Sequence, residues 1–271
     1  MVKTKRITVV GASGRMGQML CRAVEEKQDL ELAGLIETAS HPFIGTAAKE
    51  TILGLKSSLN FSADVEEALS VSDAVIDFTN PETSVKIATL AAKHKVVSVI
   101  GSTGFSQLQL KEIAKSASNA TIIRAGNMSL GLNILTGLAK KISEVLDEDF
   151  DIEIIEMHHN KKVDAPSGTA LMLGEAIAEG KGKSLKDLKD GTRDGIIGPR
   201  KKDKIGFSVV RGGDIVGNHS VMFAGLGEQI TLQHNATDRM IFARGAVKAA
   251  KWGLTAGAGE YSMLDVLNLK K

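Results

Sequence analysis

The stretch Glu153–Ala170, EIIEMHHNKKVDAPSGTA, holds the densest group of side chains in this sequence that could do chemistry. His158 and His159 stand together, and Lys161 and Lys162 follow after one intervening residue. Imidazole titrates near neutral pH and can therefore move a proton, while an ammonium group attracts an anion. The pattern predicts proton-transfer chemistry on a small, negatively charged molecule.

The same stretch ends in Pro166, Ser167, Gly168 and Thr169, which we expect to open a helix. Amide groups at a helix start, together with the hydroxyls of Ser167 and Thr169, favour a bound carboxylate. Each residue also has an ordinary explanation: a surface histidine at a strand end, a solvated lysine pair, and a helix cap at Ser167. Their concentration in one short stretch favours a substrate site.

A second candidate site is the glycine turn GASGRMG, with Gly11, Gly14 and Gly17. A β-rich run over residues 5–10 precedes it, and apolar residues at helical spacing follow it over residues 18–27. In this setting the first glycine permits a tight turn, the second lets backbone approach a pyrophosphate, and the third lets the helix pack closely. A tight turn without a ligand is the alternative, but the strand–turn–helix order favours dinucleotide binding.

Glu37 ends the next predicted strand, residues 30–37, and lies 20 residues after Gly17. An acid at this place accepts hydrogen bonds from an adenosine ribose, and a solvated charge is the alternative. Thr38 follows where a 2′-phosphate would prefer an arginine, although Arg15 in the glycine turn offers a positive charge. NADH and NADPH therefore both stay open.

Two further turns, Gly101–Phe105 and Ala125–Met128, follow the predicted strands 96–100 and 120–124. Ligands of doubly wound sheets bind beyond the carboxyl ends of the strands, so both turns are candidates for the nicotinamide end of the cofactor. An ordinary glycine-rich turn is the alternative for each.

The elements that must position these residues fall into two groups. Up to about residue 128, strands alternate with helices, which predicts an α/β domain with a doubly wound, Rossmann-type parallel sheet. Beyond it, consecutive strands predict a second, α+β domain with an open mixed sheet that binds the substrate. The expected domains are residues 1–128 plus 239–271 and residues 129–238, with hinges near 127–130 and 235–240. The other expected elements are strand 73–79, helices 80–94, 106–117 and 129–146, strand 150–157, a helix from Ser167, a surface loop over 181–204, strands 205–210, 214–223 and 228–234, and a helix over 238–252 capped by Asn235 or Thr237.

The stretch EIIEMHHNKKVDAPSGTA closely resembles the signature of the 4-hydroxy-tetrahydrodipicolinate reductase (dihydrodipicolinate reductase) family. The resemblance implies reduction of 4-hydroxy-2,3,4,5-tetrahydrodipicolinate to tetrahydrodipicolinate, with loss of water, in diaminopimelate and lysine synthesis. It implies NADH or NADPH as the cofactor, a cyclic dicarboxylate as the substrate, and a homotetramer assembled through the sheets of the second domain. The likeness covers nearly the whole chain, through GASGRMG at 11–17, VIDFTNPE at 75–82, IGSTGF at 100–105, GFSVVRGGDIVGNH at 206–219 and YSMLDVL at 261–267.

The resemblance also assigns roles to residues of the central stretch. It makes His158 the proton donor and acceptor and Lys162 the proton-donating lysine. It makes His159, Gly168 and Thr169 substrate contacts. In the implied mechanism, water loss leaves a conjugated imine, hydride adds to ring C4, and His158 and Lys162 handle the proton.

The cofactor residues that we expect lie in the glycine turn, after the second strand and in the two later turns. Three of them depart from the family pattern: Ser13 replaces a common glycine, Thr38 an arginine, and Ser102 a common threonine, and Thr38 argues against a strong NADPH preference. The full set is Gly11, Ala12, Ser13, Gly14, Arg15, Met16, Glu37, Thr38, Gly101, Ser102, Thr103, Ala125, Gly126, Asn127 and Met128.

Composition limits the other function classes. The 271 residues are 43% hydrophobic and 24% charged, which is typical of a soluble globular protein. We expect neither a membrane helix nor, at the basic start MVKTKR, a signal peptide. The single Cys21 excludes an intrachain disulfide, fits a cytoplasmic location, and is expected to be buried. A net charge of +2 and 4% aromatic residues argue against nucleic-acid binding, and the short basic run 200–204 is interpreted as a surface loop. We expect no metal site, because cysteine pairs are absent and the histidines lack ligand spacing with carboxylates.

Two other functions stay open. Another two-domain NAD(P)-dependent reductase of a different small acid would not need the cluster HH-x-x-K followed by PSGT. A dinucleotide sensor without catalysis would lack the proton donor, yet His158 and Lys162 are both present.

Overall fold

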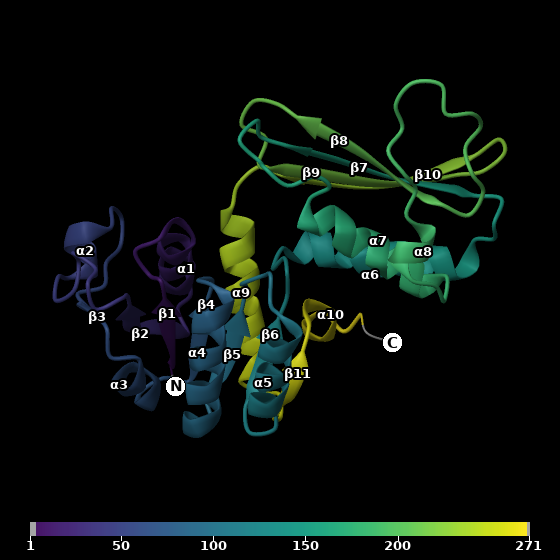
Figure 1. The fold of residues 1–271 in the computed structure, drawn as a ribbon. Helices are drawn as coiled ribbons and strands as arrows, with labels where there is room; N and C mark the ends of the chain where they lie inside the picture. Colours follow the sequence, from purple (N-terminus) through teal and green to yellow (C-terminus); the bar gives the residue numbers. More distant parts are fainter. Residues whose placement is uncertain (1–3, 270–271) are drawn as a thin grey trace. The chain divides into compact units, whose positions relative to one another are not determined.

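The computed structural model describes residues 4–269, which form two compact units (Figure 1). One unit contains the described residues up to Leu130 and those from Arg239 onward, and the other contains Gly131–Asp238. Residues 1–3 and 270–271, which the sequence interpretation assigns to the first domain, lie outside the described residues. None of the helices described here has the length and apolar character that crossing a membrane requires.

The first unit is built on one parallel sheet, which confirms the predicted α/β class. Seven described strands lie in the order β11-β6-β5-β4-β1-β2-β3, and every neighbouring pair is parallel. The order runs outward in both directions from β1 and β4, as in doubly wound folds. The strands are β1 (Lys5–Val10), β2 (Leu30–Ile36), β3 (Phe61–Ser62), β4 (Ala74–Asp77), β5 (Val97–Ile100), β6 (Thr121–Arg124) and β11 (Gly259–Tyr261). The helices are α1 (Arg15–Glu25), α2 (Ala48–Thr51), α3 (Val65–Ser70), α4 (Pro81–His94), α5 (Gln107–Ala117), α9 (Met240–Gly253) and α10 (Met263–Val266).

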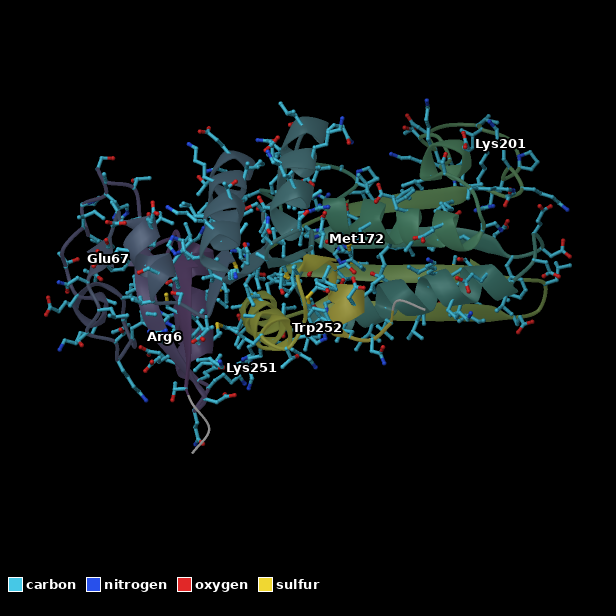
Figure 2. The ribbon with its side chains drawn as sticks, turned by 90° about the horizontal axis from the view of Figure 1, so that it is seen from below. Arg6, Glu67, Met172, Lys201, Lys251 and Trp252 are labelled. Atoms are coloured by element: carbon cyan, nitrogen blue, oxygen red, sulfur yellow. The ribbon has the colours of Figure 1, made fainter. Side chains whose placement is uncertain are left out.

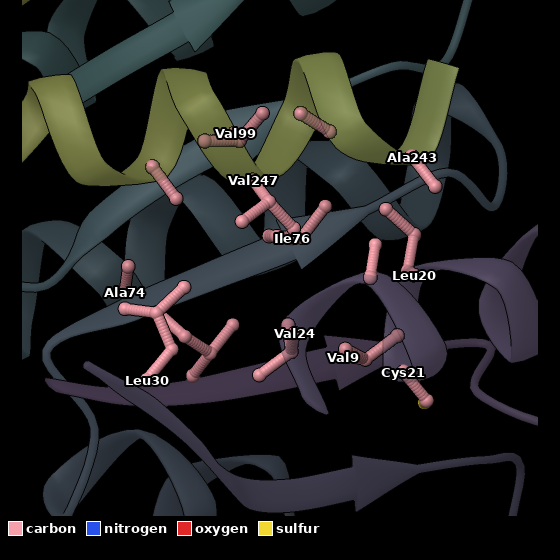
Figure 3. Packing of buried hydrophobic residues seen from close by; sticks show 14 of the residues in the cluster. Val9, Leu20, Cys21, Val24, Leu30, Ala74, Ile76, Val99, Ala243 and Val247 are labelled. Carbon is pink, nitrogen blue, oxygen red and sulfur yellow. The ribbon is translucent and has the colours of Figure 1, made fainter. Parts of the chain in front are cut away.

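Successive side chains of the buried strands point to opposite sides of this sheet, so both faces are apolar and are covered by helices. Val9 and Ile76 pack with Leu20 of α1 and Val247 of α9, as Figure 3 shows. Their chain neighbours, such as Val75, pack on the other face against α3 and α4. Because α9 contributes to this core, a segment that follows the second unit in sequence completes the first.

Local signals explain several helix boundaries of the first unit. Asn80 caps α4 by accepting from the Thr83 amide, and Pro81 occupies the first helical position, where no amide donor is needed. Ser106 and Gln109 form a capping box at the start of α5. Cys21 is fully buried, and burial raises the pKa of its thiol to about 12, so it serves packing, as predicted.

The second unit pairs one mixed sheet with helices. Its strand order is β10-β9-β7-β8, in which β7 is parallel to β8 and antiparallel to β9. Side chains of α6 and α7 pack on one face around Ile154 and Phe223. Figure 2 labels side chains of both units, with Met172 on α7 and Trp252 on α9 among them. The elements are α6 (Leu130–Val145), β7 (Asp151–His158), α7 (Gly168–Gly180), α8 (Leu185–Leu188), β8 (Ile205–Arg211), β9 (Gly217–Ala224) and β10 (Gln229–Ala236).

Some boundaries predicted from the sequence are wrong. The segment 181–204 is not entirely a loop, because Ser184 caps the short helix α8. β9 begins at Gly217 rather than 214. Asn235 does not cap α9, because β10 extends through it to Ala236 and pairs it with β9, and the N-cap of α9 is Arg239, which follows Thr237 by two residues.

Candidate active site

The glycine turn between β1 and α1 is as tight as its sequence predicts. Gly11 has φ +69°, a backbone conformation that residues other than glycine rarely adopt. A Cβ at Gly17 would lie 2.0 Å from the Gly11 carbonyl oxygen, so only glycine lets the helix approach the turn this closely. Both glycines therefore serve the geometry of the turn itself.

The backbone amides of this turn mostly donate to acceptors within the protein, and the predicted cofactor contacts of the turn stay predictions. The amides of Gly11 and Ala12 both donate to the Ile36 carbonyl, and the Gly14 amide donates to Gly11. The Ala12 side chain is fully buried. The first amides of a helix have no acceptor inside it, so a pyrophosphate would be held by the start of α1 from Arg15 onward.

Glu37 directly follows β2 and lies against the same turn. Its Oε1 accepts from the Ser13 amide at 2.8 Å and from the Ser13 hydroxyl at 2.7 Å. The carboxylate is therefore fixed beside the turn, where a dinucleotide's adenosine ribose would lie. Thr38, the next residue, is exposed on the surface.

A pocket of about 330 Å³ lies at the carboxyl ends of the strands of the first unit. It brings together residues of the glycine turn and of both later turns, as the sequence predicts. Phe78, Arg239 and Phe242 also line it, and the sequence interpretation missed them. Its lining consists of Arg15, Met16, Phe78, Gly101, Gly126, Asn127, Met128, Arg239 and Phe242.

The residues of these turns suit a nicotinamide, which has an apolar ring face and a polar edge. A Cβ at Gly101 would lie 2.4 Å from the Phe78 ring, so glycine is required there. Thr103 lies close to the second turn, since its Cγ2 is 3.8 Å from the position of a Cβ at Gly126. The residues present therefore fit a reduced nicotinamide dinucleotide.

Ser102 is mostly buried and belongs to a hydrogen-bonded network with Ser84 and Asp77, and its predicted cofactor contact stays a prediction. Asp77 ends β4 and is fully buried, and its Oδ2 accepts from Ser84 Oγ at 2.5 Å. Ser84 Oγ is also hydrogen-bonded to Ser102 Oγ at 2.9 Å. Thr79 donates to Asp77 Oδ1 through both its amide and its hydroxyl. Burial raises the pKa of Asp77 despite these hydrogen bonds. The Asp77 carboxyl thus connects the turns after β4 and β5 through hydrogen bonds.

In the second unit, the central strand β7 presents His158 and Glu156 on the same face. His158 Nδ1 lies 2.7 Å from Glu156 Oε2, and both residues are buried. An ionised carboxylate only accepts, so Nδ1 donates to it and the proton-accepting lone pair of the neutral ring is at Nε2. Burial first, and then the charges of Lys162 and Arg211, lower the pKa of His158, although Glu156 acts to raise it. The imidazole is therefore held neutral with Nε2 as its reactive atom.

Glu156 is kept ionised although burial alone would raise its pKa. Arg211 at the end of β8 donates to both oxygens, at 2.7 and 2.8 Å, and the Ser167 amide donates to Oε1 at 2.9 Å. These bonds, together with the one from His158, hold the pKa of Glu156 below its ordinary value.

His219 on β9 completes the cluster. Its ring contacts that of His158 edge to face, with centroids 5.0 Å apart. Burial first, and the nearby His158 second, lower the pKa of His219 to about 4. Its Nε2 lies 3.2 Å from Ser167 Oγ. Ser167 Oγ also caps α7 at the Ala170 amide, and the residue is 2% exposed. The Ser167 hydroxyl thus has internal partners in this structure, and its predicted substrate contact stays a prediction.

The remaining predicted residues surround this cluster. Lys162 forms an ion pair of 2.8 Å with Asp164 and is close enough that its charge lowers the pKa of His158. His159 Nδ1 is buried and, within the described residues, has no hydrogen-bond partner. Gly168 is exposed where α7 begins. Lys161 points to solvent.

The sequence interpretation missed Glu156, Arg211 and His219. The signal for Glu156 was present, because residues two apart on a strand share a face. Arg211 and His219 are brought in by strand register, which pairs Arg211 with His158 and His219 with Glu156. In the described part of the chain, no cluster of three or more potential metal ligands occurs.

The fold and the two sites together define a class, the two-domain oxidoreductases that use a nicotinamide dinucleotide. An amine dehydrogenase from Mycobacterium smegmatis has the same fold, with a TM-score of 0.62 over 96% of this chain and 95% of its own, at 13% identity. That similarity concerns the fold alone.

The chain belongs to the dihydrodipicolinate reductase family. The family's N-terminus matches residues 5–128 and its C-terminus matches residues 131–267. A 4-hydroxy-tetrahydrodipicolinate reductase from Ruegeria sp. (strain TM1040) is 52% identical over 97% of this chain and 98% of its own, and one from Bartonella tribocorum is 48% identical over the same shares. A dipicolinate-bound dihydrodipicolinate reductase from Paenisporosarcina sp. TG-14 has a TM-score of 0.78 at 27% identity, over 97% of this chain and 98% of its own.

Proposed function

We propose that this protein reduces 4-hydroxy-tetrahydrodipicolinate, with loss of water and with NADH or NADPH as reductant, in diaminopimelate and lysine synthesis. The relatives at 48–52% identity over nearly the full chain carry this activity in their names. The observation that carries the proposal is the buried pair Glu156–His158 beside Lys162, because it supplies an oriented proton carrier and a cation in one place.

The substrate is a cyclic dicarboxylate, and the second unit offers matching positive groups. Lys162 and the start of α7, with Gly168 and Thr169, provide a cation and helix-start amides for a carboxylate. His159 Nδ1 is a further polar atom without an internal partner in the described chain. The structure from Paenisporosarcina holds dipicolinate, a planar relative of such a substrate.

The proton is handled by this chain's own residues. The reduced nicotinamide supplies a hydride when bound. Glu156 fixes the His158 ring through Nδ1, so that Nε2 accepts or returns a proton at the substrate. Lys162 donates a proton to the enamine that hydride addition leaves, and the ion pair with Asp164 keeps it near His158.

We also propose a homotetramer joined through the open face of the second sheet, in the cytoplasm. Side chains of α6 and α7 pack on one face of this sheet, while β9 alternates buried and half-buried residues along its length. Val209 and Val210 on β8 are 38% and 44% exposed, respectively. The hinges near 127–130 and 235–240 and their closing motion stay predictions, which the division of the chain into units after Leu130 and before Arg239 supports.

A coupled assay tests the activity. The unstable substrate is made in place from pyruvate and aspartate semialdehyde by the preceding synthase, and oxidation of NADH and of NADPH is followed separately. Oxidation should require both the synthase and this protein, and should collapse in His158→Gln and Lys162→Ala, by about 100-fold or more. Lys161→Ala, at an exposed neighbour, is the matched control and should keep near-normal rates.

The alternatives give different outcomes in the same assay. Binding of a dinucleotide without any oxidation by folded protein would exclude the reductase function and favour a sensor. Oxidation with another small acid but not with this substrate would favour a reductase of different specificity.

A further inference from the structure

Ser13, Glu37 and His41 form a hydrogen-bonded cluster at the expected ribose end of the dinucleotide site. Ser13 Oγ donates to Glu37 Oε1 at 2.7 Å and lies 3.1 Å from His41 Nε2. The Ser13 amide donates to the same Oε1 at 2.8 Å. His41 is in turn held by the Phe43 amide, which donates to its Nδ1 at 3.2 Å. The three side chains come from the glycine turn, the end of β2 and the loop after it.

The direction of these hydrogen bonds is fixed by the Phe43 amide. Since that amide donates to His41 Nδ1, Nδ1 carries a lone pair, and the neutral ring has its proton on Nε2. Nε2 therefore donates to Ser13 Oγ, and the Ser13 hydroxyl donates to Glu37. The chain of donors therefore ends on the Glu37 carboxylate.

In the described part of the chain, the hydrogen bonds that Glu37 accepts come from Ser13 and not from a cation. The residues that follow Glu37, Thr38 to Ser40, are exposed and uncharged. Arg15 lines the pocket with Phe78 and Gly126, at the carboxyl ends of other strands of the sheet, and Glu37 is not part of that pocket. Both Ser13 hydrogen bonds go to Oε1, so Oε2 is the oxygen to which ribose hydroxyls would donate.

We propose that His41, acting through Ser13, positions the Glu37 carboxylate so that the protein selects NADH over NADPH. This inference rests on the proposed function only in that it assumes a nicotinamide dinucleotide site. A fixed carboxylate accepts hydrogen bonds from a free 2′-hydroxyl and repels a 2′-phosphate. His41 is a positioning residue, because it acts on the ribose end only through Ser13 and Glu37.

Isothermal titration of the full chain with NADH and with NADPH, without substrate, measures the selectivity directly. Wild-type protein should bind NADH about tenfold or more tightly than NADPH. Glu37→Gln, which removes the charge but keeps the shape, should bring the two Kd values within about threefold. Ser13→Ala and His41→Leu should lower the ratio of the Kd for NADPH to the Kd for NADH about threefold or more. The change should come mainly from weaker binding of NADH.

Two further variants separate positioning from a general structural effect. His41→Gln keeps an N–H group that can donate to Ser13 Oγ and should restore most of the selectivity lost in His41→Leu. Ser40→Ala, on the same loop, should leave both Kd values unchanged. Equal binding of the two dinucleotides by wild type, an unchanged ratio in Glu37→Gln, or parallel weakening of both ligands in His41→Leu would each overturn the inference.

The two proposals can fail separately. Selective NADH binding by a protein that does not turn over the substrate would leave this inference standing and exclude the proposed function. Turnover of the substrate with equal affinity for both dinucleotides would support the proposed function and overturn this inference. Failure to bind either dinucleotide would overturn both.

Discussion

His158 and Arg211 are direct partners across the parallel pair β7–β8, and both side chains reach the same carboxylate, that of Glu156. Glu156 thereby receives hydrogen bonds from a neutral donor and from a permanent cation. The arginine keeps the acid ionised in a buried place, and the ionised acid keeps the imidazole oriented. The reactive atom of His158 is therefore set by a residue that does not itself need to touch the substrate.

Glu156→Gln should lower the His158 pKa further, because the carboxylate raises that pKa against the effect of burial. We expect the imidazole titration followed by NMR to move to lower pH, and the catalytic efficiency to fall about 10–100-fold. Glu175→Gln, at an exposed position on α7, is the control and should change neither quantity. An unshifted His158 titration in Glu156→Gln would show that Glu156 does not govern this histidine.

Gly217→Ala should disturb His158 without touching any polar contact. The added Cβ would lie 3.0 Å from His158 Nε2, so the ring must move by a few tenths of an ångström. We expect kcat to fall about tenfold, because proton transfer depends steeply on position. Gly212→Ala is the matched control, since its Cβ would meet nothing within 4 Å. Equal activity of the two variants would contradict the assignment of Nε2 as the reactive atom.

His219→Gln should change how stability depends on pH. The pKa of His219 is lowered from 6.5 to about 4 in the folded protein, so the unfolded chain binds the proton more readily. Stability is therefore lost as pH falls from about 6.5 towards 4. Between pH 7 and pH 4.5 this residue should account for about 2–3 kcal/mol of the loss in unfolding free energy. Urea unfolding at both pH values should show a correspondingly smaller loss in the variant, and an identical loss would refute the pKa assignment.

Asp77→Ala should weaken dinucleotide binding from beneath the pocket. It removes the acceptor of Ser84 and Thr79, which we expect to cost about 1–3 kcal/mol of unfolding free energy. Because Ser84 is hydrogen-bonded to Ser102, the turn after β5 should loosen and the Kd for NADH should rise several-fold. Asp77→Asn keeps the shape and an acceptor, so it should recover most of both losses. A less stable Asp77→Ala protein with unchanged Kd would show that the turn does not depend on this network.

Local patterns in the sequence predict the architecture of the first unit and the positions of His158 and Lys162. The glycine turn lies between an apolar strand and an amphipathic helix, so its neighbours in the chain determine its structure. The histidines follow a buried strand directly, and that strand fixes where they emerge. These features need no knowledge of distant segments.

The parts that sequence reasoning missed depend on distant segments. Arg211 reaches Glu156 only through the register of β8 on β7, and His219 only through that of β9. The amides of Gly11 and Ala12 are used by Ile36, which follows from how β2 lies beside β1. Asn235 has the residue type of a helix cap, but pairing with β9 keeps it in a strand.

The parallel pairing of β7 with β8 also has a consequence for how the protein is made. Arg211 and Glu156 are 55 residues apart in the chain, and the intervening segment contains α7 and α8. Before β8 has left the ribosome, Glu156 has no arginine partner that would keep its carboxylate ionised when it is buried. Because closing a long loop costs chain entropy before the contact stabilises the fold, we expect the proton-transfer site to form late in the folding of its unit. Catalytic competence of a newly synthesised chain should therefore report completed folding rather than the mere presence of its catalytic residues.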